Sequence, residues 1–164
     1  MINEFNEKSQ EHITKFHPML VAILTEAQVI SELDFEVMEG PQSARRQEEL
    51  WYKGEIAKEG GPDTYGLGCY LSVSIGGIMC MNMSVYTELA TAMSYGASNL
   101  GHKLFWSGVY TEEGMSDITT IGTESLQSMI EECHKKARAE GWDYVPRLNY
   151  FELLPADSCF LISF

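Results

Sequence analysis

The chain has 164 residues, of which 45% are hydrophobic, and this suffices for the core of one domain. Eleven Lys and Arg residues against 24 Asp and Glu residues give a formal net charge of -13, which argues against binding to nucleic acid or anionic membranes. No stretch has the roughly 20 apolar residues of a membrane span, and the first residues lack the apolar segment of a signal peptide.

The N-terminal part of the chain predicts two helices. Asn6 or Ser9 is suited to cap a short first helix, because the side chains of both residue types accept hydrogen bonds from free backbone N–H groups. Pro18 is expected to open a second helix, since proline at the first helical position loses no hydrogen bond. Apolar residues follow it at three- and four-residue steps, which predicts a helix with one buried face.

A strand and a surface helix are expected next. Residues 34–39 alternate in polarity over a short span, which is typical of a strand. Ser43 is a good N-cap for a helix over residues 44–52, and Gly54 is expected to end that helix in a left-handed conformation. The helix has few apolar residues, so we expect it to lie on the surface.

The central part predicts a hairpin followed by a helix and a strand. Residues 69–75 are rich in strand-forming side chains, and two glycines separate them from a returning strand over 78–83. Ser84 is expected to cap a helix that runs to Leu100. Another strand is expected over residues 102–106.

The remaining segments complete an expected α+β fold, a small and mostly antiparallel sheet flanked by helices in a single domain over 1–164. Residues 111–122 are polar and predict a loop, and 123–140 predict a helix with an apolar stripe. The apolar tail 155–164 is either a further strand or a segment that seeks a partner. The four cysteines form no Cys-x-x-Cys pair, which favours free buried thiols.

A strand is predicted from Leu148, and it directs two polar side chains the same way. Alternation places Tyr150 and Glu152 on one face, towards whatever cleft the sheet borders. Arg147 would stand at the entrance to this strand. It follows Pro146, a residue that cannot donate to a sheet and therefore belongs at a strand start or edge.

Several segments share their order and pattern with one enzyme family, namely residues 16–20, 35–40, 43–54, 65–73, 100–108 and 150–153. In this order they resemble the zinc peptidases that cut bacterial cell-wall peptides. This family comprises the D-alanyl-D-alanine carboxypeptidases and the phage L-alanyl-D-glutamate endopeptidases, and it shares the fold of the hedgehog signalling domain. Residues 111–141 lie outside the resemblance and are interpreted as an inserted loop and helix.

The resemblance implies a zinc site whose ligands are replaced in this chain. The family holds zinc with two His and one Asp. Tyr65 stands at the first His, Ser72 at the Asp and Tyr150 at the second His. Arg147 stands at the position of the general base and Gln42 at that of a substrate-binding Arg. Protonated Tyr and Ser are poor zinc ligands, and Arg cannot accept a proton, so we expect no metal, no cofactor and no catalytic residue.

The replaced positions allow two interpretations of the old cleft. In one, Tyr65, Trp106 and Tyr150 form an aromatic floor, with Arg147 and Gln42 at its edge, that binds a peptide or a glycan. In the other, the tyrosines fill the volume of the lost metal and form hydrogen bonds through their hydroxyls. The histidines fall on separate segments and form no alternative metal-binding pattern.

The functional expectation is an inactive peptidase-like protein that serves as a structural or interaction component of a bacteriophage virion, such as a head, tail or baseplate part. It would be assembled in the host cytoplasm, with neighbouring virion subunits or further copies of itself as partners. The alternatives are a module that binds peptidoglycan without cutting it, and an active cell-wall endopeptidase with unusual ligands.

Overall fold

A computed structural model of the chain describes residues 4–41, 43–53, 66–111, 114–119, 126–144 and 146–153. Its elements in chain order are α1 (Glu7–Ile13), α2 (Pro18–Ile30), β1 (Phe35–Glu39), α3 (Ala44–Tyr52), β2 (Gly68–Ile75), β3 (Ile78–Cys80), α4 (Met83–Asn99), β4 (Phe105–Thr111), β5 (Gly114–Asp117), α5 (Leu126–Glu140) and β6 (Tyr150–Glu152). Within these residues, six strands form one sheet in the order β1-β2-β6-β4-β5, with β3 paired to β2. Every pair is antiparallel, so the predicted α+β architecture is confirmed.

The helix starts follow the capping residues that the sequence offers. The side chain of Asn6 accepts a hydrogen bond from the backbone N–H of Ser9 at 2.8 Å, so Asn6 is the cap of α1. Pro18 occupies the first turn of α2, and Ser43 accepts from the N–H of Arg46 at 3.1 Å before α3. These three predictions are confirmed. The expected end of α3 at Gly54 lies outside the described residues.

The hairpin strand β3 is shorter than predicted. It ends at Cys80, and α4 begins at Met83 with Asn82 as its N-cap. The carboxamide oxygen of Asn82 accepts from the backbone N–H of Ser84 at 2.9 Å. The strand expected up to residue 83 and the cap expected at Ser84 were therefore wrong by a few residues, because Asn82 provides the capping oxygen first.

The strand predicted over 102–106 starts later and runs further, and part of the loop expected over 111–122 is a strand. β4 pairs with β6 on one side and β5 on the other, with Phe105 opposite Asp117 and Thr111 opposite Gly114. Long-range pairing, rather than the local pattern, sets these bounds. The helix predicted from residue 123 is described from Leu126, and the tail 155–164 lies outside the description.

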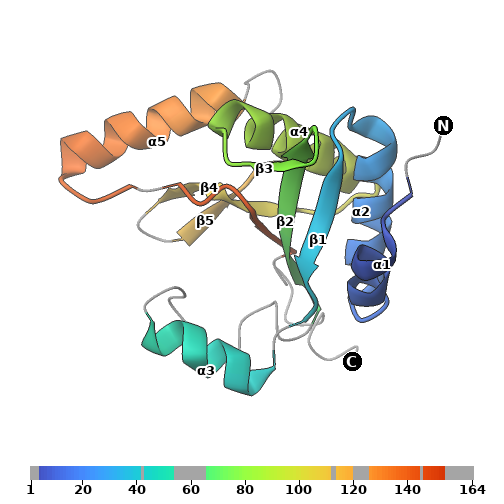
Figure 1. The fold of residues 1–164 in the computed structure, drawn as a ribbon. Coiled ribbons are helices and arrows are strands. Elements are labelled where there is room, and N and C mark those ends of the chain that lie inside the picture. Colours follow the sequence, from blue (N-terminus) through green and yellow to red (C-terminus); the bar gives the residue numbers. More distant parts are fainter. Residues whose placement is uncertain are drawn as a thin grey trace.

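Helices cover one face of the sheet, and α3 lies apart from these helices. α2 packs along α4, α1 packs on β1, and α5 contacts β4 and α4. Figure 1 shows α4 and α5 above the sheet, with α3 below it. None of the described helices is long and apolar enough to cross a membrane.

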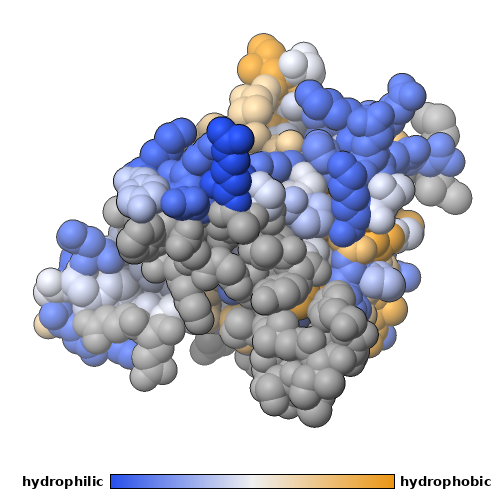
Figure 2. Space-filling model, turned by 90° about the horizontal axis from the view of Figure 1, so that it is seen from below, coloured by the Kyte–Doolittle hydropathy of each residue, from blue (hydrophilic) through white to orange (hydrophobic). Residues whose placement is uncertain are grey.

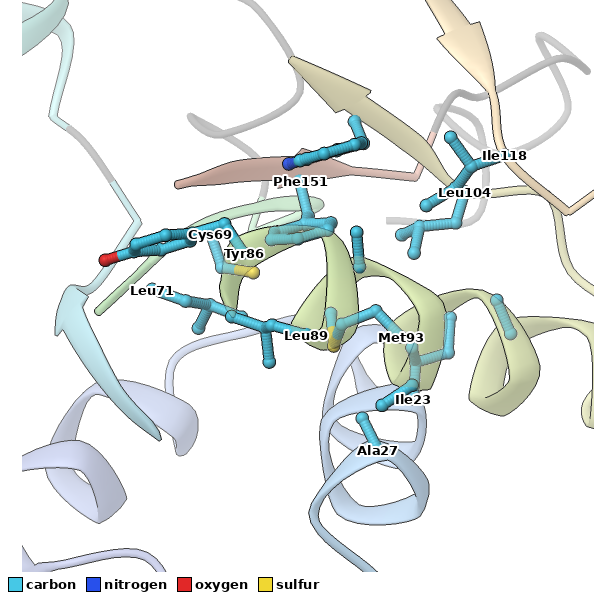
Figure 3. Close-up of a cluster of buried hydrophobic side chains, with 14 of the residues drawn as sticks. Ile23, Ala27, Cys69, Leu71, Tyr86, Leu89, Met93, Leu104, Ile118 and Phe151 are labelled. Atoms are coloured by element: carbon cyan, nitrogen blue, oxygen red, sulfur yellow. The ribbon is translucent and has the colours of Figure 1, made fainter. Parts of the chain in front are cut away.

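The core lies between the sheet and the helices α2 and α4. Alternate residues of β2 and the inward faces of both helices have no exposed surface, including Leu71, Leu89 and Ile23. Figure 3 shows Leu89 and Met93 of α4 directed towards side chains of the sheet and of α2. Phe151 of β6 joins them from the strand beside β2. This packing fixes which face of β2 and β6 points away from the helices.

We expect Leu89→Ala to lower the free energy of unfolding by about 3 kcal/mol, because it removes a fully buried side chain and leaves a cavity. Val29→Ala is the control, since Val29 is 71% exposed on α2 and its truncation should change stability by less than about 0.5 kcal/mol. Chemical denaturation followed by circular dichroism measures both. Equal losses for the two variants would contradict the described core.

Candidate functional site

The face of the sheet that points away from α4 carries the residues singled out in the sequence. Tyr70 of β2 lies directly opposite Tyr150 of β6, and Gly68 lies opposite Glu152. Ser72 is two residues beyond Tyr70 and therefore shares its face, diagonally from Tyr150. Two positions that the resemblance assigns to zinc ligands are thus brought to the same face of neighbouring strands.

A hydrogen bond joins the two polar side chains of β6. The Tyr150 hydroxyl donates to Oε2 of Glu152 at 2.8 Å, which confirms that both side chains point the same way. Glu152 is only 9% exposed. Burial raises the pKa of this carboxyl, and the hydrogen bond from Tyr150 acts in the opposite direction but is the smaller effect. The carboxyl of Glu152 therefore holds its proton to a higher pH than an exposed glutamate does.

The ring of Tyr150 is held from two sides. It lies over Gly68, where a Cβ atom would overlap the hydroxyl oxygen of Tyr150 and approach its Cζ atom to 3.0 Å. The ring of Tyr70 packs against it with a centroid distance of 4.7 Å and an interplanar angle of 40°. Glycine at position 68 is thus required by close approach, and the tyrosine fills the space that it leaves.

Trp106 does not line this face, contrary to the predicted aromatic floor. Its side chain is fully buried, and its indole N–H donates to the carbonyl of Leu148 at 2.9 Å. Its ring stacks with Phe151 at 6.1 Å. Trp106 and Phe151 are directly opposite in register, so both project to the core side of the sheet, away from Tyr150.

Arg147 lies three residues before β6, because this strand begins at Tyr150 and not at Leu148 as predicted. Its side chain is exposed, and its backbone N–H donates to the carbonyl of Ser107 at 3.2 Å. The Ser107 hydroxyl donates in return to the carbonyl of Arg147 at 2.6 Å. These bonds attach the segment before β6 to β4 and leave the guanidinium near the surface. Gln42 and Tyr65, the other predicted cleft residues, lie outside the described residues.

Two of the histidines, His17 and His134, have structural roles. His17 is the N-cap of α2, and its Nδ1 accepts from the backbone N–H of Met19 at 3.2 Å. Burial lowers the pKa of His17, and the nearby charge of His102 lowers it further. His134 packs edge-on against the ring of Tyr144. Across the part of the chain that the structure describes, no three His, Cys, Asp or Glu side chains gather closely enough to hold a metal ion.

Tyr70 belongs to this site although no sequence motif pointed to it. Its position was nevertheless encoded, because it lies two residues from both Gly68 and Ser72 and so shares their face of β2. What the sequence did not provide was the register with β6 that places Tyr70 opposite Tyr150.

Comparison with known proteins identifies the fold. No family model and no curated protein matches the chain. Among solved structures, it is similar to the L-Ala D-Glu endopeptidase ChiX of Serratia marcescens, with a TM-score of 0.68 and 19% sequence identity. The match covers 94% of this chain and 92% of that chain. The chain therefore has a peptidase-like fold.

We expect Tyr150→Phe to raise the pKa of Glu152 further. The hydroxyl of Tyr150 stabilises the ionised carboxylate, and phenylalanine cannot donate this hydrogen bond. A carbon-13 NMR titration of the glutamate carboxyl groups measures the change. Tyr95→Phe, at a site 58% exposed on α4, is the control and should leave the titration of Glu152 as in the wild type. An unchanged pKa in Tyr150→Phe would contradict the hydrogen bond.

The buried carboxyl also predicts a pH dependence of stability. The pKa of Glu152 in the folded chain lies above its ordinary value of 4.5, so between these two pH values the folded chain binds more protons than the unfolded one. The contribution of Glu152 to the free energy of unfolding therefore falls as pH rises through this window. Glu152→Gln should remove that contribution, whereas Glu88→Gln, an exposed position on α4, should retain it. Denaturation curves recorded across the window test this.

Proposed function

We propose that this chain is a catalytically inactive peptidase-like protein that serves as a structural or interaction component of a bacteriophage virion. The fold is that of a peptidase, and the position that the resemblance assigns to the second zinc-binding His carries Tyr150. The observation that carries the proposal is the hydrogen bond that this tyrosine donates to Glu152.

The side chains at the old site do not suit a catalytic zinc ion. The Tyr150 hydroxyl acts here as a hydrogen-bond donor to Glu152, whereas a tyrosine that binds zinc must be deprotonated. Ser72 is 5% exposed and provides a neutral hydroxyl in place of a carboxylate. Arg147, at the position of the general base, cannot accept a proton. Neither the ligands nor the base of the family chemistry are supplied by these residues.

The virion assignment comes from the resemblance and from the surface charge. The sequence resembles phage endopeptidases as well as cellular enzymes, and reuse of a lytic fold as a particle component is an analogy with that family. With a formal charge of -13, the chain is unsuited to bind DNA inside a capsid, which favours protein contacts instead.

The absence of catalysis is tested by adding zinc to the purified protein and recording a native mass spectrum. We expect no stoichiometric zinc adduct and no release of peptides from purified peptidoglycan, because the ligand and base positions are occupied by Tyr, Ser and Arg. The Serratia endopeptidase serves as the positive control for hydrolysis. One zinc ion per chain together with peptidoglycan cleavage would refute the proposal and identify an active endopeptidase.

Peptidoglycan binding and the role in the particle require separate measurements. Co-sedimentation with insoluble peptidoglycan that is lost in Arg147→Ala would instead identify a cell-wall-binding module. For the virion role, we expect mass spectrometry of gradient-purified particles to detect the chain at a fixed ratio to the major structural protein. Its absence from purified particles would contradict the virion assignment.

A further inference from the structure

The β2–β3 hairpin projects from the sheet on a tight turn. Ile75 pairs with Ile78, and Gly76 and Gly77 between them have φ values of 60° and 80°. Two consecutive positive φ values at the centre of a two-residue loop are typical of a type I′ turn, which continues the twist of both strands. The hairpin lies towards the viewer in Figure 1 and is held to the body of the protein through β2 and the start of α4.

The end of this hairpin exposes several large apolar side chains. Ile75 is 55% exposed, Ile78 74%, Met79 56% and Met81 63%. Figure 2 shows the molecule from below, so the side that faces the viewer in Figure 1 is at the upper edge. An apolar projection stands at this edge, and the described residues beneath it are mainly hydrophilic. By register Ile75 and Ile78 share one face of the hairpin, and Met79 lies on the other face. Single exposed apolar residues are common on soluble proteins, whereas several on one short projection mark an interaction surface.

The hairpin also lacks the charge that characterises the rest of the chain. No Asp, Glu, Lys or Arg occurs between residues 66 and 87, although the whole chain has 24 acidic residues. The chain has a net charge of -13, so a basic partner would be attracted to its acidic surface. The uncharged hairpin therefore does not suit a basic partner. The hairpin suits a partner surface that is itself apolar and uncharged.

No described strand pairs with the outer edge of β3. Among the strands that the structure describes, β3 pairs only with β2. In a two-residue hairpin the residues that flank the turn form a hydrogen-bonded pair, so the N–H and C=O of Ile78 and Cys80 face β2. Those of Met79 then point to the open edge. Edge strands are usually protected by Lys, Pro or a bulge, and β3 has neither Lys nor Pro.

We propose that β3 pairs with β3 of a second copy of this chain, so that two copies form a dimer with twofold symmetry. In an antiparallel pair centred on Met79, the two Met79 residues exchange both N–H to C=O hydrogen bonds, and Ile78 and Met81 of each copy cover the contact. A second copy fits because its hairpin is equally apolar and uncharged. Contact between the two hairpins brings no charged side chains of residues 66–87 together, because this segment has none.

This dimer gives the proposed interaction role a surface and a partner. The dimer proposal rests on the proposed function in one respect: a protein that serves through its contacts needs a contact surface. Zinc binding and peptidoglycan hydrolysis test the loss of catalysis without reference to assembly, so a failure of either proposal is distinguishable from a failure of the other.

Sedimentation equilibrium of the purified chain tests the dimer. We expect a monomer–dimer equilibrium in which Ile78→Lys raises the dimer dissociation constant at least about tenfold, because it places a charge in the apolar contact. Val29→Lys is the matched control, since it adds the same charge at a residue that is 71% exposed on α2 and should leave the constant unchanged. A wild-type chain that stays monomeric, or equal effects of the two lysines, would overturn the proposal.

A second variant tests strand pairing separately from apolar contact. Met79→Pro removes the one N–H that β3 is expected to direct to its partner, and proline is tolerated on an edge strand. We expect it also to weaken the dimer at least about tenfold, with unchanged circular dichroism and an unchanged monomer melting profile. A folded Met79→Pro variant that dimerises as the wild type does would overturn the β3–β3 pairing.

Discussion

The structure depends on β2 more than on any other described element. This strand pairs with β1 along one edge and with β6 and β3 along the other. Its alternation divides the sheet into two chemical environments, because Cys69 and Leu71 face the helices while Tyr70 and Ser72 face away from them. A slip of one residue would exchange these faces and place polar side chains in the core. The core and the candidate site are therefore fixed by one register.

The candidate site is organised by the burial of one carboxyl. Glu152 is nearly enclosed, and a buried carboxyl requires a hydrogen-bond donor. Tyr150 supplies this donor from the same strand, and its ring occupies the space over Gly68. While Glu152 is protonated, this arrangement is neutral and needs no ion to balance it. The strands β2 and β6 can therefore pack closely around this carboxyl.

Charged residues are distributed unevenly along the chain. Acidic residues cover much of the chain, whereas the β2–β3 hairpin has none and exposes Ile78 and Met81. Because like charges repel each other, the dimer proposed above uses the part of the chain where this repulsion is weakest. The site over Gly68 and the β2–β3 hairpin lie at different ends of β2, so a substitution in one of them leaves the other in place.

The sequence by itself determined the starts of α1, α2 and α3, the approximate positions of β1 and β2, and the common face of Tyr150 and Glu152. These features depend on local chemistry, such as the capping oxygen of Asn6, the ring of Pro18 and the two-residue period of a strand. Where two capping residues stood close together, as Asn82 and Ser84 do, the local pattern did not distinguish between them.

Only the tertiary structure decided what depends on pairing between distant segments. The strand β5 has little intrinsic strand preference and forms because β4 offers it hydrogen bonds. Trp106 could have faced a cleft, but its register with Phe151 places it in the core. Tyr70 joined the site for the same reason, since its partner Tyr150 is 80 residues further along the chain. Register and long-range contact have no signature in the local sequence, so these assignments required the folded chain.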